Sequence, residues 1–232
     1  MFNNQRYSGS VAQGFMSKVY GWMCAGLAVT ASVSYMLSPE VNPMLLKVLL
    51  SNIFLMGLLF IVKFGILMYI AWNYVNLSYT TMSALFIVVC GLQGIAMAPV
   101  LYFYTAASVF YVFLIAAGMF ASMALYGWMT DADLSSMGNI LLMGLVGLIL
   151  ANLINIFVQS SSFNIVIASI GVGIFAMLTA YDVQNLKRYS QYGITSPEDA
   201  GKFALLGAIS LYLNMLNMFI YLLRLFGEER RR

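Results

Sequence analysis

The sequence predicts an all-α protein that crosses a membrane about seven times. Of its 232 residues, 62% are hydrophobic and only 8% are charged, whereas a soluble domain carries about 25% charged residues because its surface faces water. The charges are also segregated, and they leave apolar stretches of roughly 18–25 residues, the length that spans a bilayer as a helix. So few charges cannot cover a water-facing surface of this size. Lipid is therefore the expected solvent for most of the chain.

Seven apolar stretches are expected to span the membrane, with short polar links between them. They are Val19–Leu37, Leu49–Trp72, Thr81–Phe103, Ala106–Met129, Asn139–Val158, Phe163–Tyr181 and Phe203–Phe226. The first stretch is too long for the apolar core of a signal peptide and lacks a cleavage pattern, so we expect it to be retained. We therefore divide the chain into a polar N-terminal tail (residues 1–18), a seven-helix transmembrane domain (19–227) and a charged C-terminal tail (228–232).

The residue inventory argues against an enzyme. The chain has no histidine, which excludes zinc-protease HExxH sites, Ser-His-Asp triads and haem ligation through histidine. It also has no G-x-x-x-x-G-K-[ST] nucleotide loop. An aspartyl protease needs two carboxylates that share a proton, but every acidic residue except Asp182 falls in an expected loop or tail. We expect no catalytic residue, no metal site, no cofactor and no nucleic-acid partner.

Asp182 is the most singular residue of the chain, because it lies at the end of an expected span. A carboxylate near a helix C-terminus opposes the helix dipole, and its burial in a bilayer costs a few kcal/mol. Such a residue usually faces the interior of a helix bundle and has a partner there. Two interpretations stay open at this stage. Asp182 either borders an ion path, or it reaches the water of the headgroup layer and has no role.

Other polar residues in the expected spans are candidate partners of Asp182 or candidate lining of a polar path. Asn214 and Asn217 are one turn apart on the last span, and Asn152 and Asn155 repeat that spacing on the fifth. Asparagines also serve as plain hydrogen-bonding links between helices. Lys63, inside the second span, either faces a polar interior or indicates that this helix is tilted or has different ends.

Three segments carry a resemblance to a known family. They are AGMFASMALYG at 117–127 followed by DLSS at 133–136, TAYDVQ at 179–184, and AISLYLN at 208–214 followed by NMF at 217–219 and LLRLFG at 222–227. With these segments in this order, the chain resembles the Bax inhibitor-1 family, also called transmembrane Bax-inhibitor-motif or YccA-like proteins. The likeness extends over nearly the whole chain.

The resemblance implies a fold in which six helices wrap the last one, and a role as a pH-sensitive calcium leak channel. In such proteins two aspartates, one on each of the last two helices, share a proton and contact a basic residue near the end of the second helix. Asp182 matches the first aspartate, whereas Asn214 stands at the second position. The region around Asn73–Asn76, where the basic residue is expected, is neutral.

This departure changes the expected response to pH. Two neighbouring carboxylates share a proton because like charges repel one another, and that places a titration near physiological pH. The pair of Asp182 and Asn214 lacks this repulsion. We therefore expect the pH gate of the family to be weakened or altered in this chain, with calcium or protons as the candidate ions.

A second functional class is a membrane interaction protein. Members that this chain resembles restrain a membrane-anchored ATP-dependent protease complex or modulate stress-response partners, and flux through protein-containing liposomes would discriminate this class from a channel. A secondary transporter is disfavoured because inverted repeats are not visible. We expect a bacterial inner membrane as the location. Basic residues are nearly balanced between the two sides, and the first helix favours a cytoplasmic N-terminus.

Overall fold

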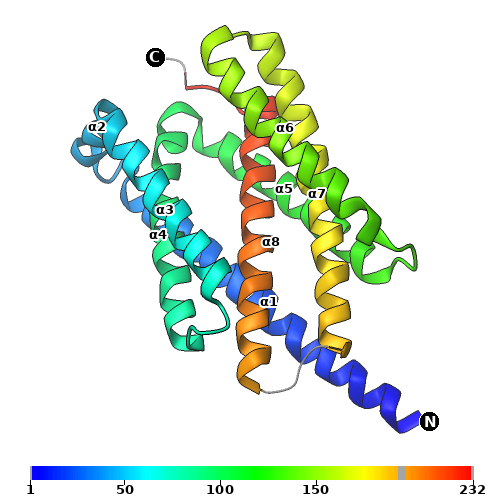
Figure 1. The fold of residues 1–232 in the computed structure, drawn as a ribbon. Coiled ribbons are helices and arrows are strands. Elements are labelled where there is room, and N and C mark those ends of the chain that lie inside the picture. The colour runs from blue at the N-terminus through cyan, green and yellow to red at the C-terminus, as the bar shows by residue number, and fades with distance from the viewer. Residues whose placement is uncertain (1, 193–196, 231–232) are drawn as a thin grey trace. The chain divides into compact units, whose positions relative to one another are not determined.

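The computed structural model describes the backbone of residues 2–192 and 197–230, and the side chains of 14–191 and 198–230. This part of the chain is helical, and its one pairing of extended residues is an isolated bridge between Tyr104 and Glu229. The helices are α1 (Phe2–Met36), α2 (Pro43–Ser51), α3 (Ile53–Asn73), α4 (Tyr79–Phe103), α5 (Ala106–Met129), the 3₁₀ turn η1 (Leu134–Ser136), α6 (Met137–Val158), α7 (Ser161–Tyr192) and α8 (Pro197–Phe226) (Figure 1).

Six segments of the described chain are long and apolar enough to cross a membrane. They comprise α3, α4, α5, η1 with α6, and most of α7 and α8, and they correspond to the second to seventh expected spans. The expectation of an all-α protein with several transmembrane helices is thereby confirmed. The first expected span lies within α1, which is not among the six, and its apolar sequence contains the polar residues Thr30, Ser32 and Ser34.

Three element boundaries differ from those expected. The second span was expected to begin at Leu49, but α2 ends at Ser51 and α3 begins at Ile53. Asn52 separates them, and its side chain accepts a hydrogen bond from the Leu55 amide at 3.0 Å, so it caps a new helix. At the N-terminus α1 already begins at Phe2, and α7 continues past the expected end to Tyr192. The division into a tail, a transmembrane domain and a second tail stays a prediction.

By their contacts, the helices form two compact units, and the first comprises residues 1–105, 193–212 and 229–232. Its described core lies where α1 meets α4 and the first half of α8. The Thr30 hydroxyl is 2.6 Å from the Tyr212 hydroxyl and donates to the Cys90 carbonyl at 3.0 Å. The Phe86 ring packs edge-on against the ring of Tyr212, which is fully buried. Gly94 lets α1 approach α4, because a Cβ there would meet the Thr30 carbonyl at 2.8 Å.

The second unit comprises residues 106–192 and 213–228. It contains α5, η1, α6, α7 and the second half of α8. Figure 1 shows α6 and α7 as neighbours joined by a short turn, where Gln159 adopts a left-handed backbone with φ of 50°. Gly127 of α5 packs directly on the Ala180 backbone of α7. The second half of α8 contacts α5 through Phe113–Phe219 ring packing and contacts α7 through Tyr221 against Gly171.

Helix α8 thus belongs to both units, with residues up to Tyr212 in the first and residues from Leu213 in the second. It is the most buried of the candidate spans, with 67% of its apolar window buried. Its partners are α1 and α4 in the first unit and α5, α6 and α7 in the second. These contacts hold within each unit, and the expectation that six helices wrap the last one stays a prediction.

The close approach at Gly127 gives a test of the α5–α7 packing. Gly127→Ala places a methyl group against the Ala180 backbone, and such overpacking costs about 1–3 kcal/mol. The matched control is Gly118→Ala on the same helix, where a Cβ has no neighbour within 4 Å. We expect the first variant to unfold at lower denaturant concentration in detergent, and the control to be unchanged or slightly stabilised. Equal stability of the two variants would contradict this packing.

Candidate functional site

Asp182 of α7 and Asn214 of α8 lie side by side in the second unit. The Asn214 amide Nδ2 donates a hydrogen bond to the Asp182 carboxylate Oδ2 at 2.7 Å. Asn214 is buried, with 6% of its surface exposed, and Asp182 is half-buried. The structure therefore brings together the two residues that the sequence singled out, and their role in ion passage stays a prediction.

Packing of the residues just before Asp182 sets the direction of its side chain. The Ala180 backbone lies against Gly127 of α5, and the Tyr181 ring lies over Gly138 of α6. Residues two apart on a helix point about 200° from one another, so the contact of Ala180 with α5 turns Asp182 away from that helix. The opposite face of α7 is the one that meets Asn214 of α8.

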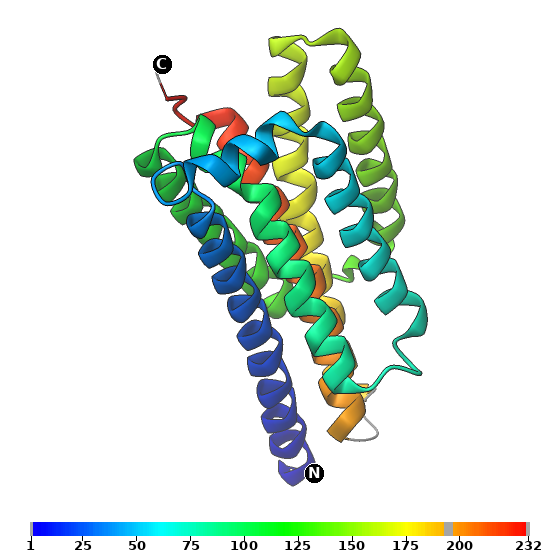
Figure 2. The same cartoon turned by 90° about the vertical axis from the view of Figure 1, so that its left-hand side faces the viewer.

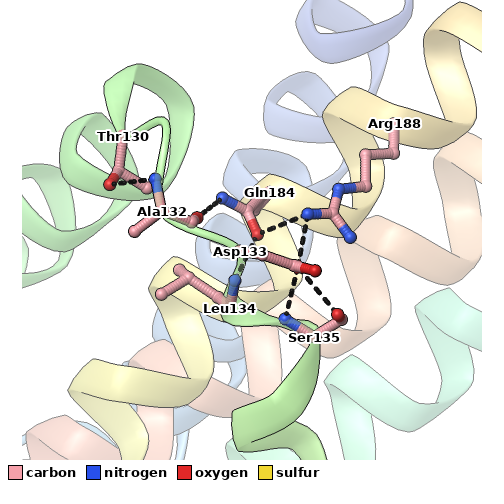
Figure 3. A network of polar contacts seen from close by, with 7 residues as sticks. All are labelled: Thr130, Ala132, Asp133, Leu134, Ser135, Gln184 and Arg188. Atoms are coloured by element: carbon pink, nitrogen blue, oxygen red, sulfur yellow. Dashed lines mark hydrogen bonds and ion pairs between the residues drawn. The ribbon is translucent and has the colours of Figure 1, made fainter.

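Polar contacts fasten the loop between α5 and α6 to the last turns of α7 (Figure 3). The Gln184 amide donates to the Ala132 carbonyl at 2.7 Å, and its oxygen accepts from the Leu134 amide at 2.9 Å. The Arg188 guanidinium donates to the Asp133 carboxylate at 2.6 Å and to Gln184 at 3.2 Å. We call these contacts of Gln184 and Arg188 with the loop the loop clasp. They hold the turn of α7 that directly follows Asp182.

A second cation of α7 completes the attachment. Lys187 Nζ donates to the Trp128 carbonyl at 2.7 Å and lies 5.5 Å from the centre of the Trp128 ring. It therefore satisfies one of the carbonyls that the last turn of α5 leaves without a helical partner. Sequence reasoning missed Gln184, Lys187 and Arg188 as positioning residues. The signal that was present is the pattern Asp133-x-Ser135, which is typical of a side chain that caps its own turn.

The hydrogen bonds and the ion pair in and around the loop clasp also lower the pKa of Asp133. Its carboxylate accepts hydrogen bonds from the Ser135 hydroxyl at 2.7 Å and the Ser135 amide at 3.0 Å, and it pairs with Arg188. These donors, the Ser135 hydroxyl first, hold the pKa of Asp133 well below its usual range. Asp133 therefore keeps its charge throughout the physiological range.

The other asparagines make separate contacts in the same unit. Asn152 of α6 donates to the Tyr221 hydroxyl at 3.0 Å and accepts from Arg224 at 2.9 Å, so it joins α6 to α8. The Oδ1 atom of Asn155 is buried without a hydrogen-bond partner in the described chain. Asn217 is half-buried, one turn after Asn214 on α8. Whether these residues line a polar path stays a prediction.

Lys63 belongs to the first unit, where it is ten residues from each end of α3. Its Nζ atom donates to Gln93 Oε1 of α4 at 2.7 Å and lies 5.1 Å from the centre of the Phe60 ring. Gln93 is buried, with 5% of its surface exposed. Lys63 thus contacts a buried polar group of α4, and α3 begins at Ile53 instead of Leu49. Whether Lys63 lines a polar path stays a prediction.

The pair of Asp182 and Asn214 offers one carboxylate and one amide between two helices. In the described residues no cluster of three or more His, Cys, Asp or Glu side chains is placed to hold a metal ion. A single carboxylate with an amide oxygen is a weak oxygen site, which suits brief contact with a passing cation better than tight binding.

A family model described as "Inhibitor of apoptosis-promoting Bax1" matches residues 12–231. The chain belongs to this family. Inner membrane protein YbhL of Escherichia coli is 38% identical over 220 residues, which cover 94% of this chain and 93% of that protein. A protein of Borreliella burgdorferi is 36% identical, covering 93% and 92% of the two chains. One of Deinococcus radiodurans is 37% identical, covering 93% and 90%.

Membership in the Bax inhibitor family confirms the resemblance that the three sequence segments indicated. The apolar helices and this membership together identify the chain as an integral membrane protein. The matched region of this Bax inhibitor family protein includes all six candidate spans, both members of the Asp182–Asn214 pair and the loop clasp.

The lowered pKa of Asp133 predicts how the loop clasp responds to acid. A carboxylate with a depressed folded pKa contributes stability above its unfolded pKa, about 3.9, and loses it as the pH falls through the folded pKa. We therefore expect hydrogen-exchange protection of the Ser135 amide, corrected for intrinsic exchange, to be constant between pH 8 and pH 5. Asp133→Asn should lower this protection at neutral pH. Loss of protection in wild type between pH 7 and pH 5 would contradict the assignment.

Proposed function

We propose that this protein is a calcium leak channel of a bacterial inner membrane, with an ion path that passes the Asp182–Asn214 pair. The observation that carries the proposal is the 2.7 Å contact of a half-buried carboxylate with a buried amide inside a membrane-spanning bundle. Keeping a carboxylate within a candidate membrane span, Ser161–Gln191, costs free energy that packing alone does not require. An intramembrane ionisable residue with a helix-borne partner therefore suggests a functional site.

The chemistry of the pair suits a cation that must leave again. Calcium prefers oxygen ligands and binds tightly only when six to eight of them converge. Asp182 supplies a carboxylate and Asn214 a carbonyl oxygen, so the pair attracts a cation without enclosing it. Conduction requires binding that is weak enough for release. The inner-membrane location rests on the name of the Escherichia coli relative.

The response to pH should differ from that of a pair of aspartates. Asn214 neither gains nor loses a proton between pH 5 and pH 8, so the two residues cannot share one. The amide donates to the carboxylate at every pH in this range at which Asp182 is ionised. A channel gated by this pair therefore lacks the upper pKa that repulsion between two carboxylates raises toward neutral pH, and its flux should change little across the neutral range.

The second functional class that the sequence leaves open is a modulator of a membrane-anchored protease or of stress-response partners. The two classes predict different behaviour of the purified protein. A channel conducts in liposomes that contain no other protein, whereas a modulator does not.

Calcium flux into dye-loaded liposomes, measured at several pH values, tests the proposal. Wild type should conduct with a shallow pH dependence, and Asn214→Asp should make that dependence steeper by restoring the second carboxylate. The matched control is Asn164→Asp, which adds the same charge to α7 about 27 Å from Asp182 along the helix. This control should keep the shallow response.

A further variant tests the carboxylate itself. Asp182→Asn removes the charge that attracts the cation while it preserves the shape of the side chain, and we expect calcium flux to fall by about tenfold, which corresponds to about 1.4 kcal/mol. Two results would defeat the proposal. One is the absence of flux from correctly folded wild type, and the other is a wild-type pH response that is already steep and unchanged in Asn214→Asp.

A further inference from the structure

The length and the start of α3 indicate that helix α2 lies at the level of the lipid headgroups. The 21 residues of α3 extend about 31 Å at 1.5 Å per residue, which matches the thickness of a hydrocarbon core, about 30 Å. Ile53 therefore enters the apolar layer. Since α2 ends at Ser51 and the helix breaks at Asn52, α2 remains outside that layer.

The orientation and the surface of α2 suit the membrane interface. Figure 2 shows α2 running crosswise from the end of α1 to the start of α3. Leu46 and Leu49 are buried against the protein, whereas Met44, Leu45 and Val48 expose 80%, 50% and 51% of their surface. A short crosswise helix with exposed apolar residues and a lysine is typical of a helix that lies in the interface.

A cavity of about 380 Å³ borders this helix, a size at the lower end of small-ligand sites. Pro43, Lys47 and Ser51 follow one another at one-turn spacing along the same face of α2, so they share one wall of the cavity. The full lining is Pro39, Pro43, Leu46, Lys47, Leu50, Ser51 and Tyr102. The site therefore combines an apolar floor with an ammonium group and a hydroxyl group.

Lys47 contributes a positive charge that the described chain does not neutralise. The ion pairs among the described residues join Arg188 to Asp133, Lys202 to Glu198, and Arg230 to Glu40. Glu40, the acidic residue nearest to Lys47 in the sequence, is therefore occupied by Arg230 at 3.1 Å. An unpaired ammonium group beside a cavity at headgroup level is complementary to a phosphate anion.

We propose that this cavity binds the headgroup of an anionic phospholipid, with the Lys47 ammonium on its phosphate. The Ser51 hydroxyl donates to the Lys47 carbonyl at 2.7 Å, so its lone pairs are left to accept a hydrogen bond from a hydroxylated headgroup such as glycerol. The exposed apolar residues of α2 then contact the upper part of the acyl chains. The site holds a lipid beside α3 and is separate from the proposed ion path.

Lipid titration of the purified full-length chain, followed by native mass spectrometry, tests this site. Phosphatidylglycerol should bind more tightly than phosphatidylcholine with the same acyl chains. Lys47→Gln should weaken the binding of phosphatidylglycerol by about fivefold, the effect of one lysine near an anionic surface, and should weaken the binding of phosphatidylcholine less, because its choline cation offsets the charge of its phosphate. Lys47→Arg keeps the charge and should keep the affinity, which also shows that position 47 tolerates substitution.

The matched control is Lys18→Gln, which removes the same charge from an exposed lysine of α1 and should not alter lipid binding. An equal loss in Lys18→Gln and Lys47→Gln would overturn the proposal, because net charge alone would then explain the affinity. Equal binding of the two lipids by wild type would overturn it as well. So would displacement by glycerol 3-phosphate at the same concentration as the lipid, because the cavity would then bind a soluble phosphate.

Discussion

A carboxylate on an apolar membrane helix is costly unless hydrogen-bond donors stabilise its charge. The Asn214 amide donates a hydrogen bond to the Asp182 carboxylate at 2.7 Å. Two features of the second unit position the Asp182 side chain for that contact. Gly127 of α5 admits the backbone of α7, and the loop clasp of Gln184 and Arg188 holds the next turn of α7. The carboxylate is thereby directed at α8, and the proposed ion path depends on its position.

The same constraint explains the other polar contacts between the helices. Lipid supplies no hydrophobic force that draws apolar helices together, so close packing and hydrogen bonds must do so. Lys63 reaches Gln93 between α3 and α4, and Thr30 reaches Tyr212 between α1 and α8. Each contact gives a polar atom a hydrogen-bond partner on the neighbouring helix. Polar residues in the spans of this protein are thus structural links in the first instance, and Asp182 differs from these examples because its charge is negative.

The sequence predicts the helical class and most of the spans because hydropathy over about 20 residues reflects the thickness of the bilayer. It also indicates Asp182 and Asn214, since a charge and an amide are rare in apolar spans. It does not reveal the break at Asn52, because the apolar pattern continues across this residue and only the side-chain cap ends one helix and begins another. The extension of α7 to Tyr192 is missed for a similar reason. Gln184, Lys187 and Arg188 look like loop residues until their contacts with the preceding loop are known.

The most direct measurement for the central contact is the coupling free energy between Asp182 and Asn214. Unfolding in mixed micelles of wild type, Asp182→Leu, Asn214→Leu and the double variant forms a complete cycle. If the amide stabilises the carboxylate within the bundle, the double variant should be more stable than the sum of the single effects predicts, by about 0.5–2 kcal/mol. Additive effects would contradict this account, because the two side chains would then not depend on one another.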